Sequence, residues 1–133
     1  MAPIGSIAYD ESANPVLCMR YEGTVDDAAW AEHIDHISEW AHRGVSYAVV
    51  IDARKVGRVP ASQRKAIVDW INRDRLHLTT NCAGGALVFS NPIQRGLWTA
   101  IMWLTPIPIP VRVFRDIHTA EEWLMSQLHL RAS

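Results

Sequence analysis

The sequence lacks an excess of charge of either sign, and it also lacks a long hydrophobic run. The formal net charge is −1, so no global positive field is available to attract the phosphates of a nucleic acid. No stretch approaches the roughly 18 uninterrupted apolar residues that would span a bilayer, and no basic residue precedes an apolar run at the N-terminus. We therefore expect a cytoplasmic protein with no nucleic acid partner and no integral membrane segment.

Cysteine is scarce, and metal-binding patterns are missing as well. The two cysteines, Cys18 and Cys82, lie far apart in apolar, strand-like stretches, which is neither a disulfide framework nor a metal motif. His33 and His36 share a predicted helix, but no third ligand accompanies them. We expect two reduced core cysteines, no bound metal and no cofactor.

The chain has enough apolar residues to form a core of its own. Hydrophobic residues make up 49% of its 133 residues and charged residues 20%, which is close to the average of soluble globular domains. This length fits one core, and no repeat or linker divides it. We expect a single domain over residues 1–133.

Short apolar stretches rich in β-branched residues predict five strands. They are expected at residues 4–9, 16–21, 47–51, 86–89 and 111–114. Turn-forming residues separate the first two stretches, which predicts an antiparallel hairpin. The stretch at 47–51 is apolar throughout and ends at Asp52, which is typical of a strand buried on both faces.

Apolar residues at spacings of three and four predict four helices. Their expected spans are 24–44, from beyond 60 to about 78, 92–104, and 119–128. Thr24, Asn91 and Thr119 are the expected N-caps, and Glu122 completes a capping box with Thr119. The order β-β-α-β-α-β-α-β-α predicts an α/β fold, in which four helices cover a mixed sheet of about five strands.

Several short sequence segments, taken together with this order of strands and helices, resemble those of a known family. Gly23 precedes the first helix, Val49-Val-Ile-Asp52 closes the third strand, and Val113-Phe-Arg-Asp116 is followed by Ala120-Glu-Glu-Trp-Leu124. In these features nearly the whole chain resembles the SpoIIAA-like family, which groups with the STAS domains of bacterial regulators. The resemblance implies a STAS-like regulatory module that acts through protein contacts. The same family is compared with the lipid-binding Sec14 domains, which implies a carrier or sensor of a small apolar ligand as an alternative.

The resemblance also bears on phosphorylation. In the anti-sigma factor antagonists, an Asp-Ser-Ser-Gly signature after the third strand carries a phosphorylated serine. The matching stretch here is Pro60-Ala-Ser-Gln63, so only Ser62 falls on a signature serine. Ser62 with the nearby cations Arg54, Lys55 and Arg58 is the candidate phosphorylation or anion site, and the alternative is a capping serine in a solvated basic loop.

Polar residues follow several of the predicted strands. The carboxyl ends of parallel strands share one rim of a sheet, which places Asp52, Ser90, Asp116 and His118 there as candidates for a ligand site. A hydrolase-type enzyme at this rim is a third hypothesis. No Gly-x-Ser-x-Gly motif or glycine-rich phosphate loop accompanies these residues, so we assign no catalytic residue.

The third predicted helix is apolar all round rather than along one stripe. Trp98, Ile101, Met102 and Trp103 are its candidates for an interface or an apolar ligand site. The proline-rich segment 106–110 could cover the side that the sheet leaves free. Otherwise a second copy of the chain, another protein or an apolar ligand is expected to cover it.

Overall fold

One five-stranded sheet forms the centre of the computed structural model, which describes residues 5–104 and 106–132. The strands are β1 (Ser6–Asp10), β2 (Val16–Gly23), β3 (Tyr47–Val56), β4 (Cys82–Val88) and β5 (Val111–Phe114), in this spatial order. β1 and β2 pair antiparallel, and the other neighbours pair parallel. This confirms the predicted antiparallel first pair and the mixed sheet. Ile4, the expected start of the first strand, lies outside the described residues.

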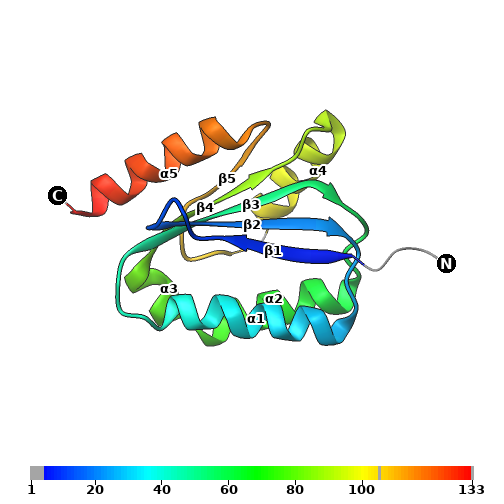
Figure 1. The fold of residues 1–133 in the computed structure, drawn as a ribbon, viewed down its shortest axis with the longest axis horizontal. Helices are drawn as coiled ribbons and strands as arrows, with labels where there is room; N and C mark the ends of the chain where they lie inside the picture. The colour runs from blue at the N-terminus through cyan, green and yellow to red at the C-terminus, as the bar shows by residue number, and fades with distance from the viewer. Residues whose placement is uncertain (1–4, 105, 133) are drawn as a thin grey trace.

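Within the described residues, five helices cover the two faces of the sheet (Figure 1). They are α1 (Asp27–Ala41), α2 (Ala61–Arg73), α3 (Arg75–Asn81), α4 (Pro92–Leu104) and α5 (Ile117–Ala132). α5 lies alone on one face, whereas α1, α2 and α3 lie together on the other. α4 contacts β5 at the edge of the sheet. None of the helices in the described part of the chain is long and apolar enough to cross a membrane.

Two apolar clusters hold these layers together. Leu17, Met19 and Trp70 belong to the cluster between the sheet and α1, α2 and α3. Val50 and Leu124 belong to the cluster between the sheet and α5. Because side chains alternate along a strand, consecutive residues such as Val16 and Leu17 enter opposite clusters. The central strands are therefore buried on both faces, as predicted for β3.

The predicted second helix is two helices, α2 and α3, joined at Asp74. Asp74 is buried, and its carboxylate accepts hydrogen bonds from Ser38 Oγ (3.1 Å) and His42 Nε2 (3.1 Å) of the α1 region. These contacts hold the junction of α2 and α3 against the α1 region. No glycine or proline marks the break, because its cause is a tertiary contact.

Two strands extend beyond the predicted bounds. β3 runs to Val56, so Asp52 lies within the strand and not at its end. β4 begins at Cys82, so Gly84 and Gly85 are strand residues. A Cβ at Gly84 would lie 3.2 Å from the Pro110 carbonyl oxygen, which explains why this strand contains a glycine.

Two of the predicted helix caps are wrong. Asp26 caps α1 by accepting a hydrogen bond from the Ala29 amide (2.8 Å), whereas Thr24 Oγ1 donates to the Arg58 carbonyl (2.8 Å). Asp116 caps α5 by accepting from the Thr119 amide (2.8 Å), so the helix begins at Ile117, two residues before the predicted start. The bounds of α4 and its cap are confirmed, because Asn91 Oδ1 accepts from the Ile93 amide (2.8 Å).

Candidate functional site

An apolar cavity of about 250 Å³ lies against the sheet in the described part of the protein. Met19 of β2 and Ile51 of β3 form part of its floor, because alternation along the strands points both toward this face. Gly85 of β4 also borders the cavity. The missing side chain at Gly85 leaves part of this space open.

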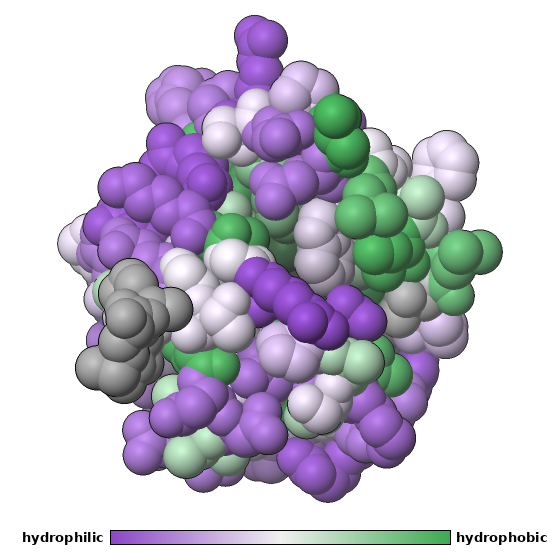
Figure 2. All heavy atoms as spheres, turned by 90° about the vertical axis from the view of Figure 1, so that its right-hand side faces the viewer, coloured by the Kyte–Doolittle hydropathy of each residue, from purple (hydrophilic) through white to green (hydrophobic). Residues whose placement is uncertain are grey.

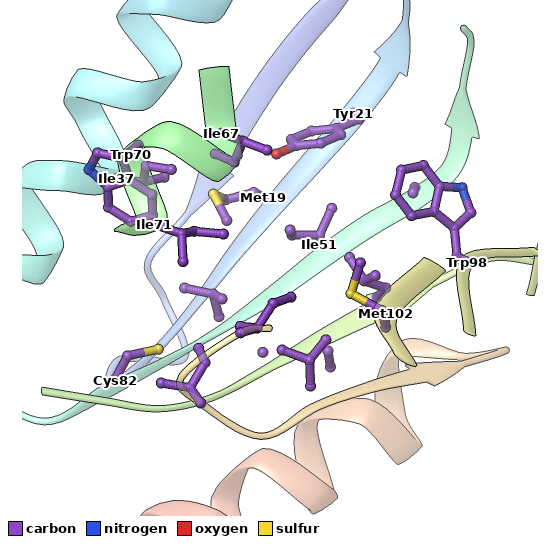
Figure 3. A pocket seen from close by; sticks show the side chains of 18 of the residues that line it. Met19, Tyr21, Ile37, Ile51, Ile67, Trp70, Ile71, Cys82, Trp98 and Met102 are labelled. Carbon is purple, nitrogen blue, oxygen red and sulfur yellow. The ribbon is translucent and has the colours of Figure 1, made fainter. Parts of the chain in front are cut away.

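Helices from two sides form the walls (Figure 3). Ile67 and Ile71 of α2 lie on one side, and Trp98 and Met102 of α4 lie on the other. Ile109 of the proline-rich segment also borders the space. Segment 106–110, which was predicted to cover α4, therefore lies on the side of α4 that faces the cavity.

We take the exposed part of the cavity lining, which belongs to α2, as the mouth of the cavity. Arg64 and Val68 line the cavity and are also exposed, and they stand one turn apart on the helix. From the side on which the parallel strands end, hydrophobic side chains gather beside a hollow in the surface (Figure 2). A small molecule could reach the hydrophobic floor from solvent without unfolding of the sheet.

Few polar groups face the inside of the cavity. The Tyr21 hydroxyl is hydrogen-bonded to His33 Nε2 (2.6 Å), and the Cys82 thiol donates to the Gly84 carbonyl (3.5 Å). Burial raises the pKa of Cys82 to about 11, which keeps this thiol protonated. The buried indole N–H of Trp40 has no hydrogen-bond partner among the described residues, and the Trp70 nitrogen points away from the cavity. The inner surface therefore favours hydrocarbon.

A buried histidine supports the wall at Tyr21. His33 of α1 is only 2% exposed and lies between the hydroxyls of Tyr9 (2.7 Å to Nδ1) and Tyr21 (2.6 Å to Nε2). Burial, with a smaller contribution from His36, lowers the pKa of His33 to about 4. The neutral imidazole has one donor and one acceptor nitrogen, so one tyrosine donates to it and the other accepts from it.

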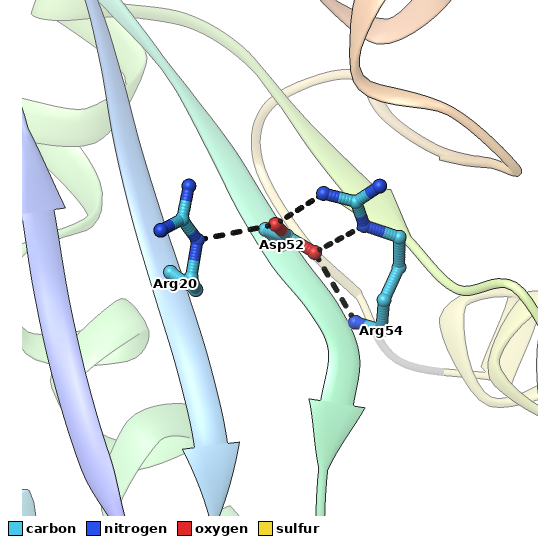
Figure 4. A network of polar contacts seen from close by, with 3 residues as sticks. All are labelled: Arg20, Asp52 and Arg54. Carbon is cyan, nitrogen blue, oxygen red and sulfur yellow. Dashed lines mark hydrogen bonds and ion pairs between the residues drawn. The ribbon is translucent and has the colours of Figure 1, made fainter.

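Asp52, a predicted rim residue, lies on the opposite face of the sheet from the cavity (Figure 4). It is 3% exposed, and its carboxylate accepts two hydrogen bonds from the Arg54 guanidinium (2.8 and 2.9 Å). Arg20 of β2 lies 3.5 Å away on the other side. The hydrogen bonds from Arg54 hold the pKa of Asp52 below its usual range. This arrangement links β2 and β3 through charge.

The other rim candidates do not contact Asp52 or form a catalytic triad in the part of the chain that the structure describes. Ser90 is exposed in the turn before α4. Asp116 caps α5 through Thr119. His118 pairs with Glu122 on the exposed side of the same helix (2.7 Å). Catalysis at this rim stays a hypothesis without an observed arrangement to support it.

The candidate anion site is divided between two elements. Ser62 is exposed in the first turn of α2. Arg54 and Lys55 belong to β3 and not to a loop, and the Arg54 guanidinium is bonded to Asp52. Arg58 follows β3 in the connection to α2. Phosphorylation of Ser62 stays a prediction.

The two faces of α4 have different surroundings. Trp98, Ile101 and Met102 line the cavity, and the Trp98 ring stacks on Phe89 at 5.8 Å. Trp103 is 85% exposed, so the four candidates are divided between the cavity and the surface. We define the outer face of α4 as its strongly exposed apolar residues, namely Ile93, Leu97, Trp103 and Leu104.

Sequence reasoning missed the half of the cavity that α2 and β2 provide. Met19, Tyr21 and Arg64 were absent from the candidates, although all three line the cavity. The one sequence feature that could have indicated the cavity was Gly85, a residue without a side chain in a strand that large apolar helices cover. No group of three or more potential metal ligands occurs among residues 5–104 and 106–132. Cys18 and Cys82 are free thiols, and Cys82 is buried.

Comparisons with known proteins place the chain in a family and a fold. Residues 12–128 match the model of a family described as a domain of unknown function, DUF7793. A solved structure from Shewanella loihica PV-4, an uncharacterized protein of the DUF3478 family with a SpoIIAA-like fold, superposes with a TM-score of 0.69. It is 14% identical, and the match covers 93% of this chain and 98% of that chain. No curated protein matches. The predicted SpoIIAA-like α/β fold is confirmed.

Proposed function

The chain belongs to the DUF7793 family of domains of unknown function, and we propose that it is a non-catalytic binding module for a small apolar molecule. The observation that carries this proposal is the apolar cavity of about 250 Å³ between α2 and α4. Water gains few hydrogen bonds from walls of this kind, so an apolar molecule displaces it favourably. The module would act as a carrier or a sensor of that molecule.

The size of the cavity limits the ligand. A cavity of roughly 150 Å³ accommodates benzene, so in proportion a volume of about 250 Å³ holds roughly ten carbon atoms. A single hydrocarbon chain or a two-ring aromatic compound fits this limit. A phospholipid with two long acyl chains does not.

Titration with decan-1-ol tests the proposal. Binding should change the tryptophan fluorescence saturably, because Trp70 and Trp98 line the cavity. At ten times its dissociation constant the alcohol should raise the free energy of unfolding by about 1.4 kcal/mol, measured by thermal unfolding. Solvent extraction of the freshly purified protein, followed by mass spectrometry, would identify a ligand that was bound in the cell.

A matched pair of glycine variants shows whether the alcohol occupies the cavity. A Cβ added at Gly85 meets Val49 and Val111 side chains at 3.5 and 3.8 Å, which is ordinary contact, and the larger side chain of Gly85→Val should fill part of the space. It should weaken binding by about tenfold or more. Gly96→Val is the control, because a Cβ at Gly96 meets no atom within 4 Å. Equal affinities of the two variants, or the absence of saturable binding, would remove the proposal.

Contact with a second copy of the chain is the other function that an observation favours. On the outer face of α4, Ile93 is 82%, Trp103 85% and Leu104 86% exposed. α4 has one charged residue, Arg95, and its guanidinium donates to the carbonyls of Phe89 and Ser90. A two-fold pairing of outer faces therefore brings large apolar groups together without opposing like charges. A regulatory role through protein contacts would use this surface.

A further inference from the structure

We propose that the ligand is a single-chain amphiphile with an anionic headgroup, a carboxylate or a phosphate, and that Arg64 binds this headgroup at the mouth of the cavity. The inference rests on the proposed apolar-ligand function and names the class of the ligand. It is carried by three observations: the position of Arg64, the absence of a carboxylate on its guanidinium, and the lack of any other charged residue in the cavity lining.

Arg64 lies where a headgroup would remain in water. It is exposed and also lines the cavity, whereas the floor residues Met19 and Ile51 lie deeper in the protein. A hydrocarbon chain on this floor would leave its polar end at the α2 side of the opening. The headgroup therefore keeps most of its hydration while the chain is buried.

The Arg64 guanidinium has donors available for such a group. One N–H donates to the Val59 carbonyl (3.1 Å), which fixes the side chain beside the opening. No carboxylate pairs with Arg64 among the described residues, although its neighbour Lys65 pairs with Asp69 (2.8 Å). The remaining donors of a planar guanidinium match the two oxygens of a carboxylate or phosphate.

No residue that lines the cavity, other than Arg64, is charged in the described part of the chain. An acidic ligand therefore meets one cation and no competing carboxylate. A cationic amphiphile would meet repulsion from Arg64 and no compensating group.

Paired probes and paired variants test this assignment. Decanoate, decyl phosphate and decan-1-ol share one chain length and differ in the headgroup, and binding to each is measured by tryptophan fluorescence. Arg64→Gln should weaken the binding of decanoate or decyl phosphate by about fivefold, which is the effect expected of a partly exposed ion pair. The affinity for decan-1-ol should change by less than about twofold. Arg64→Lys should keep part of the anion affinity. The acid whose affinity falls more identifies carboxylate or phosphate as the preferred headgroup.

Arg73→Gln is the control for net charge, because Arg73 is exposed in the last turn of the same helix and does not line the cavity. It should leave all three affinities unchanged. If decan-1-ol binds and Arg64→Gln alters neither acid, the headgroup assignment is wrong and the apolar-ligand function stands. If none of the probes binds the unmodified protein, the proposed function fails together with this inference. Thermal unfolding of each variant confirms that it is folded.

Discussion

His33 occupies a buried position that a charged imidazole would destabilise. Its ring nitrogens are bonded to Tyr9 and Tyr21, and Tyr21 also lines the cavity. Protonation would turn both nitrogens into donors, and one of the two tyrosines would then have to reverse its hydrogen bond in a buried site. The charge state of this one residue thus affects the wall of the ligand site.

The lowered pKa of His33 predicts a loss of stability in mild acid. An unfolded chain protonates this histidine near its ordinary pKa of 6.5, whereas the folded protein does so near 4. The unfolded state therefore binds more protons between these values, and stability falls as the pH is lowered through them. Between pH 7 and pH 5 the free energy of unfolding should fall by about 2 kcal/mol from this residue, measured by urea unfolding.

His33→Gln is the informative variant for this prediction. Glutamine can donate to one tyrosine and accept from the other, but it does not take up a proton in this range. Between pH 7 and pH 5, the free energy of unfolding of this variant should fall by about 2 kcal/mol less than that of the unmodified protein. A variant with the full pH dependence of the unmodified protein would show that other groups cause the acid effect.

Single residues of the site were predictable where one helix gives the signal. Trp98, Ile101 and Met102 follow from the unusually apolar character of their own helix, and all three line the cavity. Arg64 was not among the candidates, because its role depends on its distance from β2 and α4. Such distances result from the packing of separate elements, and no local pattern contains them.

At the scale of elements, local signals explain α4 well and α2 poorly. Asn91 and Pro92 start α4 through backbone hydrogen bonding that the sequence shows directly. The end of α2 depends on Asp74 bonding to α1, more than thirty residues away. The local cap of α4 was therefore predicted, whereas the end of α2, which a tertiary contact sets, was missed.

α4 has well-defined ends but packs weakly against the rest of the protein. None of its residues, all of which the structure describes, is buried. One side lines the cavity and the other is the outer face, so few packed contacts oppose local opening. Amide hydrogens of α4 should exchange faster than those of β3, and decan-1-ol should slow the exchange in α4, measured by hydrogen-deuterium exchange with mass spectrometry. Exchange in α4 as slow as in β3, and unaltered by the alcohol, would contradict this.

At the scale of the whole molecule, the alternation of strands and helices determined the sheet, and the cavity emerged only from its assembly. The predicted order accounts for the antiparallel first pair and the parallel strands that follow. The cavity exists because α2 and α4 both pack against the same face and remain apart. Sequence periodicity states that both helices have apolar sides, but it does not give the gap between them.

Association of two whole molecules is the prediction for the outer face of α4. The unmodified protein should sediment as a dimer, and Trp103→Glu should shift it toward monomer because a buried carboxylate would oppose the contact. Leu76→Glu is the matched control, since Leu76 is 76% exposed on α3 and lies outside this face. A monomeric unmodified protein at high concentration would end the dimer hypothesis. A dimer that Trp103→Glu leaves intact would place the contact elsewhere.

The edges of the sheet bear on whether such association could continue into fibres. β1 and β5 each pair on one side only, and β5 is a strand of four residues that directly follows Pro110. Arg112 projects from β5 with its guanidinium 5.6 Å from the ring centres of Phe114 and Trp123. A short edge beside a proline, with a cation on it, is a poor template for strand addition from another molecule. Strand addition at the β5 edge is therefore disfavoured, and a two-fold contact through α4 would close after two copies.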